Sequence, residues 1–259
     1  MKITLFTFCQ IRHEYLINLL SQVCTELNVV QEYVNNSAGK IPGNYPPSKT
    51  MEKYFNEVIK TQENLFKFNK NNKTNINLMR IKARTLSSLP LNNLKNFLSS
   101  DCYIVFGSSY IKGDLVDFLV KNKALNIHMG VSPFYRGTDC NFWSLYDDNP
   151  HLVGATIHLL SKGLDSGPIL YHAMSNLKNN PFEYSMSTVK SAFHSLAEKI
   201  KNKSILNIKP ENQDKSLEIR YSRRVEFNDD VVEKFFEKKI DLNKKLFDNK
   251  LLKNPFFYY

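Results

Sequence analysis

Three polar side chains in the middle of the chain could together carry out an acyl transfer. Asn126 and His128 lie two residues apart in a short apolar run. In a strand, residues at this spacing project from the same face. Asp165 lies in a segment with a glycine on each side, where the backbone can bend and bring the carboxylate into the same crevice. The spacing therefore predicts one site built from two segments.

The three residue types suit the attack of a free amine on an acyl group. The Asn126 amide could donate to the oxygen of a tetrahedral intermediate. His128 could take up and return a proton near neutral pH, and Asp165 could hold its tautomer and stabilise its charged form. Taken singly, a histidine at a strand end is more often structural, and an aspartate before Ser-Gly is more often a turn residue. Spacing alone leaves both interpretations open.

The elements that would position these residues alternate between strand and helix. Apolar strands are expected at 3–9, 28–34, 102–107 and 124–129, and helices at 14–27, 49–69 and 113–122. The polar segment 35–49 is expected to be a loop. This order indicates an α/β fold with a mostly parallel sheet flanked by helices. In such a sheet, functional residues gather beyond the carboxyl ends of the strands.

The second half of the chain continues the pattern and then changes character. A helix at 139–149, two strands within 152–174 and a long amphipathic helix at 181–203 are expected. A charged helix near 227–240 and an aromatic tail follow. We expect a catalytic domain at 1–205 and a C-terminal extension at 206–259, with the aromatic tail as one surface for a homodimer.

The composition limits the classes of partner. The 259 residues carry a formal net charge of +10. Because the lysines are scattered among asparagines without an arginine-rich block, we expect a basic solvated face that attracts phosphorylated small molecules, and no nucleic-acid partner. The four cysteines have no metal-ligand spacing, so no metal site is expected. The first apolar run is short and soon charged, and no long apolar stretch follows, which predicts a cytoplasmic protein without a membrane partner.

A wider pattern surrounds the three residues. The stretches "LNIHMGVSPFYRG" and "FWSLYDDNPHLVGATIHLLSKGLDSGPIL" resemble the formyltransferase family, which uses 10-formyltetrahydrofolate. Five elements occur in the family's order: Asn-x-His, Pro-x-Tyr-Arg-Gly, a tryptophan, Gly-Ala-Thr-Ile-His and Leu-Asp-Ser-Gly-Pro-Ile. One departure is "HMGVSP", where many members have His-Pro-Ser-Leu-Leu-Pro. The resemblance covers 101–170 and implies a Rossmann-like formyltransferase fold with Asn126, His128 and Asp165 as the catalytic residues.

The resemblance also implies where the formyl donor binds. The pterin ring of 10-formyltetrahydrofolate would lie along the loop after the strand 102–107, held by main-chain groups. The residues that fall on this place are Phe106, Gly107, Ser108, Tyr110 and Asp165.

The segment after the first strand resembles a subgroup of sugar N-formyltransferases that has a polar Gln-x-Arg-His sequence here. Gln10, Arg12 and His13 would then contact the substrate at the mouth of the crevice. A planar guanidinium binds a pyrophosphate or a sugar oxygen with two donors, which suits Arg12. Alternatively, Arg12 and His13 merely begin the first helix on its exposed side.

Two further residues follow the catalytic strand. Tyr135 and Arg136 are candidates for substrate contact, and a salt bridge that anchors the loop is the alternative for Arg136. Trp143 is expected to pack in the core, and His158 and His172 are expected to be structural.

Four kinds of family member compete as the best match. The segment after 205 looks too short and too helical for the C-terminal barrel of methionyl-tRNA formyltransferases. No glycine follows the first strand, unlike in glycinamide ribonucleotide transformylase, and that strand begins at residue 3, without the preceding regulatory domain of formyltetrahydrofolate deformylase. We therefore expect a sugar N-formyltransferase that acts on a nucleotide-linked amino sugar for surface glycans such as the O-antigen. Methionyl-tRNA formyltransferase, or a non-catalytic relative that binds folate or a nucleotide sugar, remains an alternative.

Overall fold

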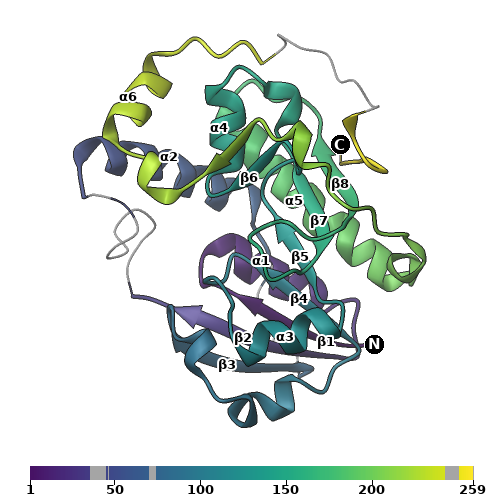
Figure 1. Ribbon diagram of the computed structural model, residues 1–259. Coiled ribbons are helices and arrows are strands. Elements are labelled where there is room, and N and C mark those ends of the chain that lie inside the picture. The colour runs from purple at the N-terminus through teal and green to yellow at the C-terminus, as the bar shows by residue number, and fades with distance from the viewer. Residues whose placement is uncertain (36–44, 46, 70–73, 243–250, 259) are drawn as a thin grey trace.

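A computed structural model describes residues 1–35, 45, 47–69, 74–242 and 251–258 (Figure 1). Most of the loop expected at 35–49 lies outside these described residues. Figure 1 shows one continuous sheet with helices packed around it.

The sheet has eight strands in the order β10-β8-β7-β5-β4-β1-β2-β3. The strands are β1 (Lys2–Thr7), β2 (Glu26–Tyr33), β3 (Ile76–Lys82), β4 (Cys102–Phe106), β5 (Leu125–His128), β7 (Ala155–Leu159), β8 (Ile169–Ser175) and β10 (Phe256–Tyr258). Neighbouring strands run parallel, except that β7 is antiparallel to both β5 and β8. The expected α/β, Rossmann-like, mostly parallel sheet is confirmed.

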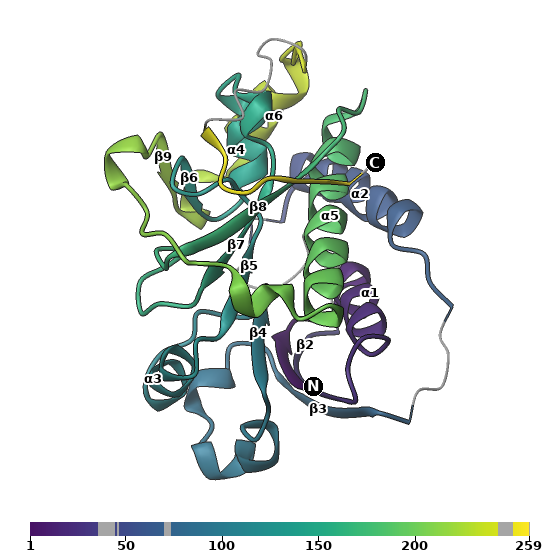
Figure 2. The same ribbon diagram turned by 90° about the vertical axis from the view of Figure 1, so that its right-hand side faces the viewer.

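Helices cover both faces of this sheet. They are α1 (Ile11–Leu20), α2 (Lys49–Leu65), α3 (Asp114–Lys121), α4 (Cys140–Tyr146), α5 (Pro181–Lys201) and α6 (Asp229–Glu237). Figure 2 shows α1 and α5 on one side of the sheet and α3 on the other. The helix α5 begins where the Asn180 side chain accepts hydrogen bonds from the main-chain nitrogens of Phe182 and Glu183, with Pro181 at the first helical position.

Two elements differ from the sequence-based expectation. The helix predicted at 14–27 begins earlier and ends earlier, because 26–33 is already the strand β2. The strand β3 was not predicted at all. It lies at the edge of the sheet with most side chains partly or fully exposed, so its sequence lacks the apolar pattern of a buried strand.

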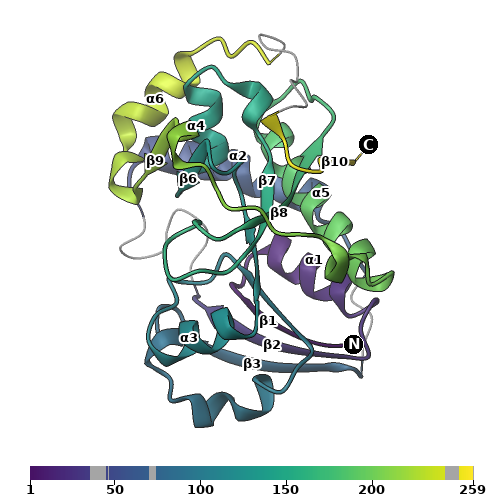
Figure 3. The same cartoon turned by 45° about the vertical axis from the view of Figure 1, so that its right-hand side comes forward.

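The C-terminal extension packs against the rest of the molecule at several places. Its strand β9 (Arg220–Ser222) pairs with β6 (Tyr135–Gly137) in a separate two-stranded sheet. Figure 3 shows β9 and α6 beside α4, at the end of the molecule opposite β3. The aromatic tail, expected as an interface strip, forms β10 and extends the main sheet beside β8. The extension is therefore continuous with the catalytic sheet.

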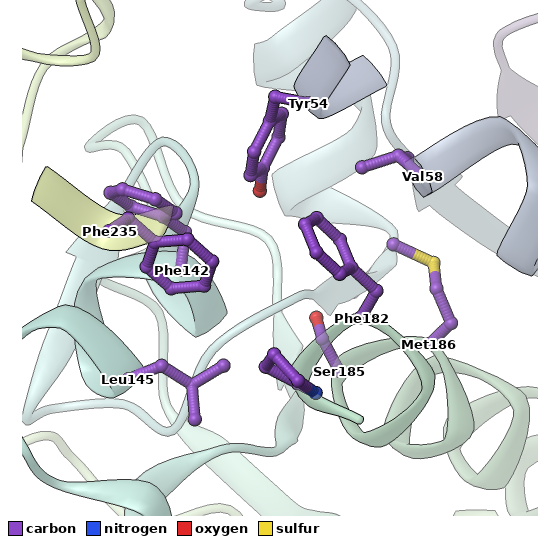
Figure 4. A pocket seen from close by; sticks show the side chains of 9 residues that line it. Tyr54, Val58, Phe142, Leu145, Phe182, Ser185, Met186 and Phe235 are labelled. Carbon is purple, nitrogen blue, oxygen red and sulfur yellow. The ribbon is translucent and has the colours of Figure 1, made fainter. Parts of the chain in front are cut away.

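A small cavity of about 20 Å³ lies between α2, α4, α5 and α6 (Figure 4). It is lined mainly by aromatic and aliphatic side chains such as Tyr54, Phe142, Phe182 and Phe235. It contains none of the residues that the sequence assigns to the site. Within the described residues, no helix is both long and apolar enough to cross a membrane.

Candidate active site

The strand β5 carries Asn126 and His128 to the carboxyl edge of the sheet, where the loop between β7 and β8 brings Asp165 against them. His128 Nδ1 lies 3.3 Å from Asp165 Oδ2. The Asn126 amide nitrogen donates to Asp165 Oδ1 at 3.2 Å. The main-chain nitrogen of Gly137 donates to Asp165 Oδ2 at 3.4 Å. Asp165 thus contacts both of the other residues that the sequence placed in one site.

A fourth side chain, His158, belongs to the same cluster. The antiparallel register of β5 and β7 places His158 opposite Asn126. Its Nδ1 lies 2.7 Å from its neighbour's main-chain oxygen, that of Leu159, and must donate to it, so Nε2 accepts the Asn126 amide at 2.9 Å. His158 was expected to be merely structural. In the structure it holds the Asn126 amide, whose two N–H groups are used by His158 and Asp165.

The protonation of the His128–Asp165 pair reflects two opposing effects. Burial lowers the pKa of His128, and the nearby Asp165 carboxylate partly restores it. Burial would raise the pKa of Asp165, but His128 and His158 outweigh it and hold this pKa below its usual value. Asp165 is therefore a carboxylate at neutral pH. His128 Nε2 also lies 3.0 Å from the main-chain oxygen of Tyr135, so only the doubly protonated ring can donate to both neighbours.

Tyr135 and Arg136 both have partners within the protein. The Tyr135 side chain is fully buried, and its hydroxyl meets Asp147 and Asn149, which leaves only its main-chain oxygen at the site. Arg136 forms an ion pair with Glu218 at 2.7 Å and donates to the main-chain oxygen of Leu164 at 2.9 Å. This is the loop-anchoring alternative for Arg136. Substrate contact by Tyr135 stays a prediction.

The loop after β4 holds the residues assigned to the formyl donor. Gly107 has φ of 60°, and a Cβ there would lie 2.7 Å from His13 Cε1, so both the backbone conformation and the close approach require glycine. Phe106 is buried at the end of β4, and the Ser108 hydroxyl donates to the main-chain oxygen of Ser109. The Tyr110 hydroxyl donates to the main-chain oxygen of Lys162 at 2.6 Å. Tyr110 thereby joins this loop to the loop of Asp165.

The segment after β1 lies beside that loop, because β1 and β4 are neighbours in the sheet. Gln10 precedes the first turn of α1, and Arg12 and His13 lie within it. Gln10 Oε1, Arg12 Nε and His13 Nε2 are buried and have no hydrogen-bond partner in the described part of the chain. His13 is only 1% exposed, so it does not lie on an exposed side of the helix.

The charges of this segment are fixed by burial. Burial lowers the pKa of Arg12 to about 10, which leaves the guanidinium charged at neutral pH. Burial, with Arg12 nearby, also lowers the pKa of His13 well below its usual value. His13 Nδ1 lies 2.7 Å from Thr7 Oγ1 and 3.2 Å from the Phe8 main-chain nitrogen, so the protein already occupies this side of the ring. A cation and the second ring nitrogen of His13 therefore stand ready for a ligand.

The other histidine of the expectations, His172, is structural as predicted. Its Nε2 lies 2.8 Å from the main-chain oxygen of Ser132, and its Nδ1 accepts from the main-chain nitrogen of Lys253. Trp143 is buried in the core, also as predicted. Among the described residues, no group of three or more histidine, cysteine, aspartate or glutamate side chains could hold a metal ion.

Comparison with known proteins identifies the family of this chain. The model of the formyl transferase family matches residues 46–205. A sugar N-formyltransferase from Shewanella sp. shares the fold with a TM-score of 0.55 and 14% identity, over 88% of this chain and 78% of that one. Glycinamide ribonucleotide transformylase 1 from Symbiobacterium toebii aligns with a TM-score of 0.53 and 13% identity, over 83% and 94%.

A third structure is the N-formyltransferase from Helicobacter canadensis in complex with folinic acid and dTDP-3-aminofucose. It aligns with a TM-score of 0.50 and 15% identity, over 88% of this chain and 72% of that one. At these identities the structures establish a common fold. The family model spans more than half of the chain, so this protein belongs to the formyl transferase family of enzymes.

Proposed function

We propose that this enzyme moves a formyl group from 10-formyltetrahydrofolate to the amine of a nucleotide-linked amino sugar. The observation that carries the proposal is the group of unpartnered, buried polar atoms on Gln10, Arg12 and His13. They follow β1, which β4 separates from β5, the strand of Asn126 and His128, and the His13 ring lies against Gly107. A polar acceptor substrate would satisfy these atoms and place its amine at the Asn126, His128 and Asp165 cluster.

The donor fits between two loops. Gly107 and Ser108 offer main-chain groups on one side, and the loop of Asp165 lies on the other, joined to the first by the Tyr110–Lys162 hydrogen bond. A pterin ring has donors and acceptors at its edge that suit main-chain partners. The folinic acid in the Helicobacter canadensis enzyme supports a formyl-folate donor in a fold of this kind.

The acceptor fits the segment after β1. The Arg12 guanidinium stays charged at neutral pH, since its pKa is about 10, and can bind a diphosphate with two parallel donors. His13 Nε2 can form a hydrogen bond with a sugar hydroxyl, and Gln10 Oε1 can accept from one. The dTDP-3-aminofucose bound by the Helicobacter canadensis enzyme is an example of such a substrate. A product of this type would serve surface glycan synthesis, for example of an O-antigen.

The reaction begins with the neutral amine of the sugar. Its nitrogen attacks the formyl carbon, the new C–N bond forms, and the carbonyl electron pair moves to oxygen. In the substrate-free arrangement both N–H groups of Asn126 are used, so one must turn from Asp165 or His158 to the oxyanion. Nδ1 of His128 faces Asp165 and Nε2 faces the main-chain oxygen of Tyr135, so Nε2 must turn from that oxygen before it takes the proton of the amine and passes it to N10 of the folate. Collapse of the intermediate breaks the bond to N10, without a covalent enzyme intermediate.

The test is formyl transfer from 10-formyltetrahydrofolate to a panel of nucleotide-linked 3-amino and 4-amino sugars, with initiator methionyl-tRNA and glycinamide ribonucleotide as competing acceptors. We expect turnover with one of the sugars, and we expect His128→Ala to abolish this turnover. His194→Gln is the matched control, because His194 lies on α5 against Tyr15. Formyl transfer to the tRNA alone would show that the acceptor is methionyl-tRNA and that the proposed sugar substrate is wrong. Binding of folate and sugar without turnover, unchanged in Asp165→Asn, would identify a non-catalytic relative.

A further inference from the structure

The loop that carries Asp165 is held by side chains from the loop itself and from other segments. Within the loop, the Ser161 hydroxyl donates to the main-chain oxygen of Gly163 at 3.0 Å and lies 2.9 Å from Ser166 Oγ. From outside it, the main-chain oxygen of Lys162 accepts from Tyr110, and that of Leu164 accepts from Arg136. The position of the Asp165 carboxylate therefore depends in part on side chains that lie outside the loop.

Gln213, on the C-terminal extension, contacts the main chain of Asp165 itself. Its amide nitrogen donates to the main-chain oxygens of Asp165 and Gly167, both at 2.8 Å. Two residues earlier, Glu211 forms main-chain hydrogen bonds with Ile169 at 2.7 and 2.9 Å, which anchors the extension beside the loop. One amide thus spans the turn that begins at Asp165.

The turn itself has an unusual backbone. Asp165 has φ of 47°, the left-handed region that non-glycine residues rarely adopt. At Gly167 a Cβ would lie 1.7 Å from the main-chain oxygen of Leu159, so the loop packs directly on its own strand. A backbone in this conformation needs outside contacts to persist. The two hydrogen bonds from Gln213 supply contacts on both sides of the turn.

The contacts of the Asp165 carboxylate are sensitive to small movements. Its distances to the Asn126 amide, His128 Nδ1 and the Gly137 nitrogen are 3.2, 3.3 and 3.4 Å. These values lie at the long end of the hydrogen-bond range, so a shift of a few tenths of an ångström would break them. We infer that Gln213 is a positioning residue, which holds the loop so that Asp165 stays in contact with His128. The catalytic part of this inference rests on the proposed function.

The pKa of His128 reports on the position of Asp165. The titratable and charged groups that face His128 are Asp165 on the loop, His158 on β7, Arg136 on β6, His172 on β8 and Cys140 on α4. Asp165 raises the pKa of His128, whereas His158 and Arg136 lower it. If the carboxylate moves away, the pKa of His128 falls. This fall in the pKa of His128 is expected whether His128 acts as the base or as the acid of the reaction.

Two variants test the role of Gln213. Gln213→Met keeps the length of the side chain but has no donor, and Gln213→Glu keeps the shape but presents a carboxylate to the two main-chain oxygens. Gln22→Met is the matched control, because Gln22 is exposed and remote in sequence from the loop. For both Gln213 variants we expect kcat to fall about 10- to 100-fold, with the KM for the sugar changed less than about threefold. Thermal unfolding of each variant shows whether the fold is retained.

The pKa of His128 distinguishes a positioning role from a merely structural one, because a structural role would leave it unchanged. It is followed by NMR in the protein without substrate, with the resonance assigned by means of His128→Gln. We expect it to fall in both Gln213 variants and to stay unchanged in Gln22→Met. Sugar turnover and a His128 pKa that both equal the wild-type values would overturn the positioning role and leave the proposed function standing. A lowered pKa in a protein that formylates no sugar would support the positioning role while the sugar substrate fails.

Discussion

Two polar clusters lie at the carboxyl edge of the sheet, one at the end of β5 and the other at the start of α1. In the first, Asn126, His128 and Asp165 use one another and His158 as hydrogen-bond partners. In the second, buried atoms of Gln10, Arg12 and His13 have no partner within the described residues. The first cluster is held together by partners within the protein. The second is organised for groups that a ligand must bring.

The largest expected effect concerns the organised cluster. Asn126→Ala removes the oxyanion donor and should lower kcat about a hundred- to a thousand-fold, with little change in the KM for either substrate. Steady-state formyl transfer checks this, with circular dichroism to confirm the fold. A loss in kcat below about threefold would mean that Asn126 only supports the strand.

The two clusters share one property, a buried neutral histidine in each, and His172 is a third. Burial lowers the pKa of His13 and His128, and lowers that of His172 to about 4. At low pH these histidines bind protons in the unfolded chain but not in the folded one. The free energy of unfolding is therefore highest above pH about 6.5, the ordinary histidine pKa, and falls as the pH drops towards 4. The shift at His172 alone corresponds to about 3 kcal/mol.

Urea unfolding at pH 7 and pH 4.5 measures this acid effect. His172→Gln keeps a donor for Ser132 but cannot titrate, so its loss of stability between the two pH values should be smaller than that of the wild-type protein. Equal losses in the two proteins would show that His172 is not held neutral.

The unpartnered cluster should govern affinity more than turnover. Arg12→Met should lower kcat/KM for the nucleotide-linked sugar about 10- to 100-fold, since a hydrogen bond to a charged group contributes about 1.5–3 kcal/mol. The affinity for the matching free nucleoside diphosphate, measured by calorimetry, should fall in parallel. Arg223→Met, at an exposed arginine, serves as the control. Unchanged diphosphate affinity would place the phosphates elsewhere.

The smallest expected effect is that of Gln10→Ser, which should stabilise the fold but weaken sugar binding. Gln10 is the N-cap of α1 but its side chain makes no capping hydrogen bond, and its oxygen is buried without a partner. Gln10→Ser should cap the helix and raise the free energy of unfolding by about 1 kcal/mol, while weakening sugar binding. Urea unfolding and the KM for the sugar give the two readings. A destabilised variant with normal KM would mean that Gln10 supports the fold.

Much of the fold was predictable because it depends on local patterns. Buried parallel strands are continuous apolar runs, and β1, β4 and β5 were each expected within a few residues of their bounds. The edge strand β3 was missed, since exposure on both faces removes that signal. The strands β9 and β10 are three residues each and pair with strands far away in the sequence. Segments this short carry no pattern from which such pairing could be expected.

The sequence by itself determined the candidate catalytic residues and their order: the spacing of Asn126 and His128, the aspartate between glycines, and the motifs of the formyltransferase family. Only the tertiary structure decided which side chains complete the cluster. His158 meets Asn126 through an antiparallel register, and Gln213 meets the Asp165 loop from the C-terminal extension. Contacts between residues far apart in the chain follow from packing, which local spacing does not encode. The tertiary structure also decided that His13 is buried, because the position of α1 against β4 sets which face of its first turn meets solvent.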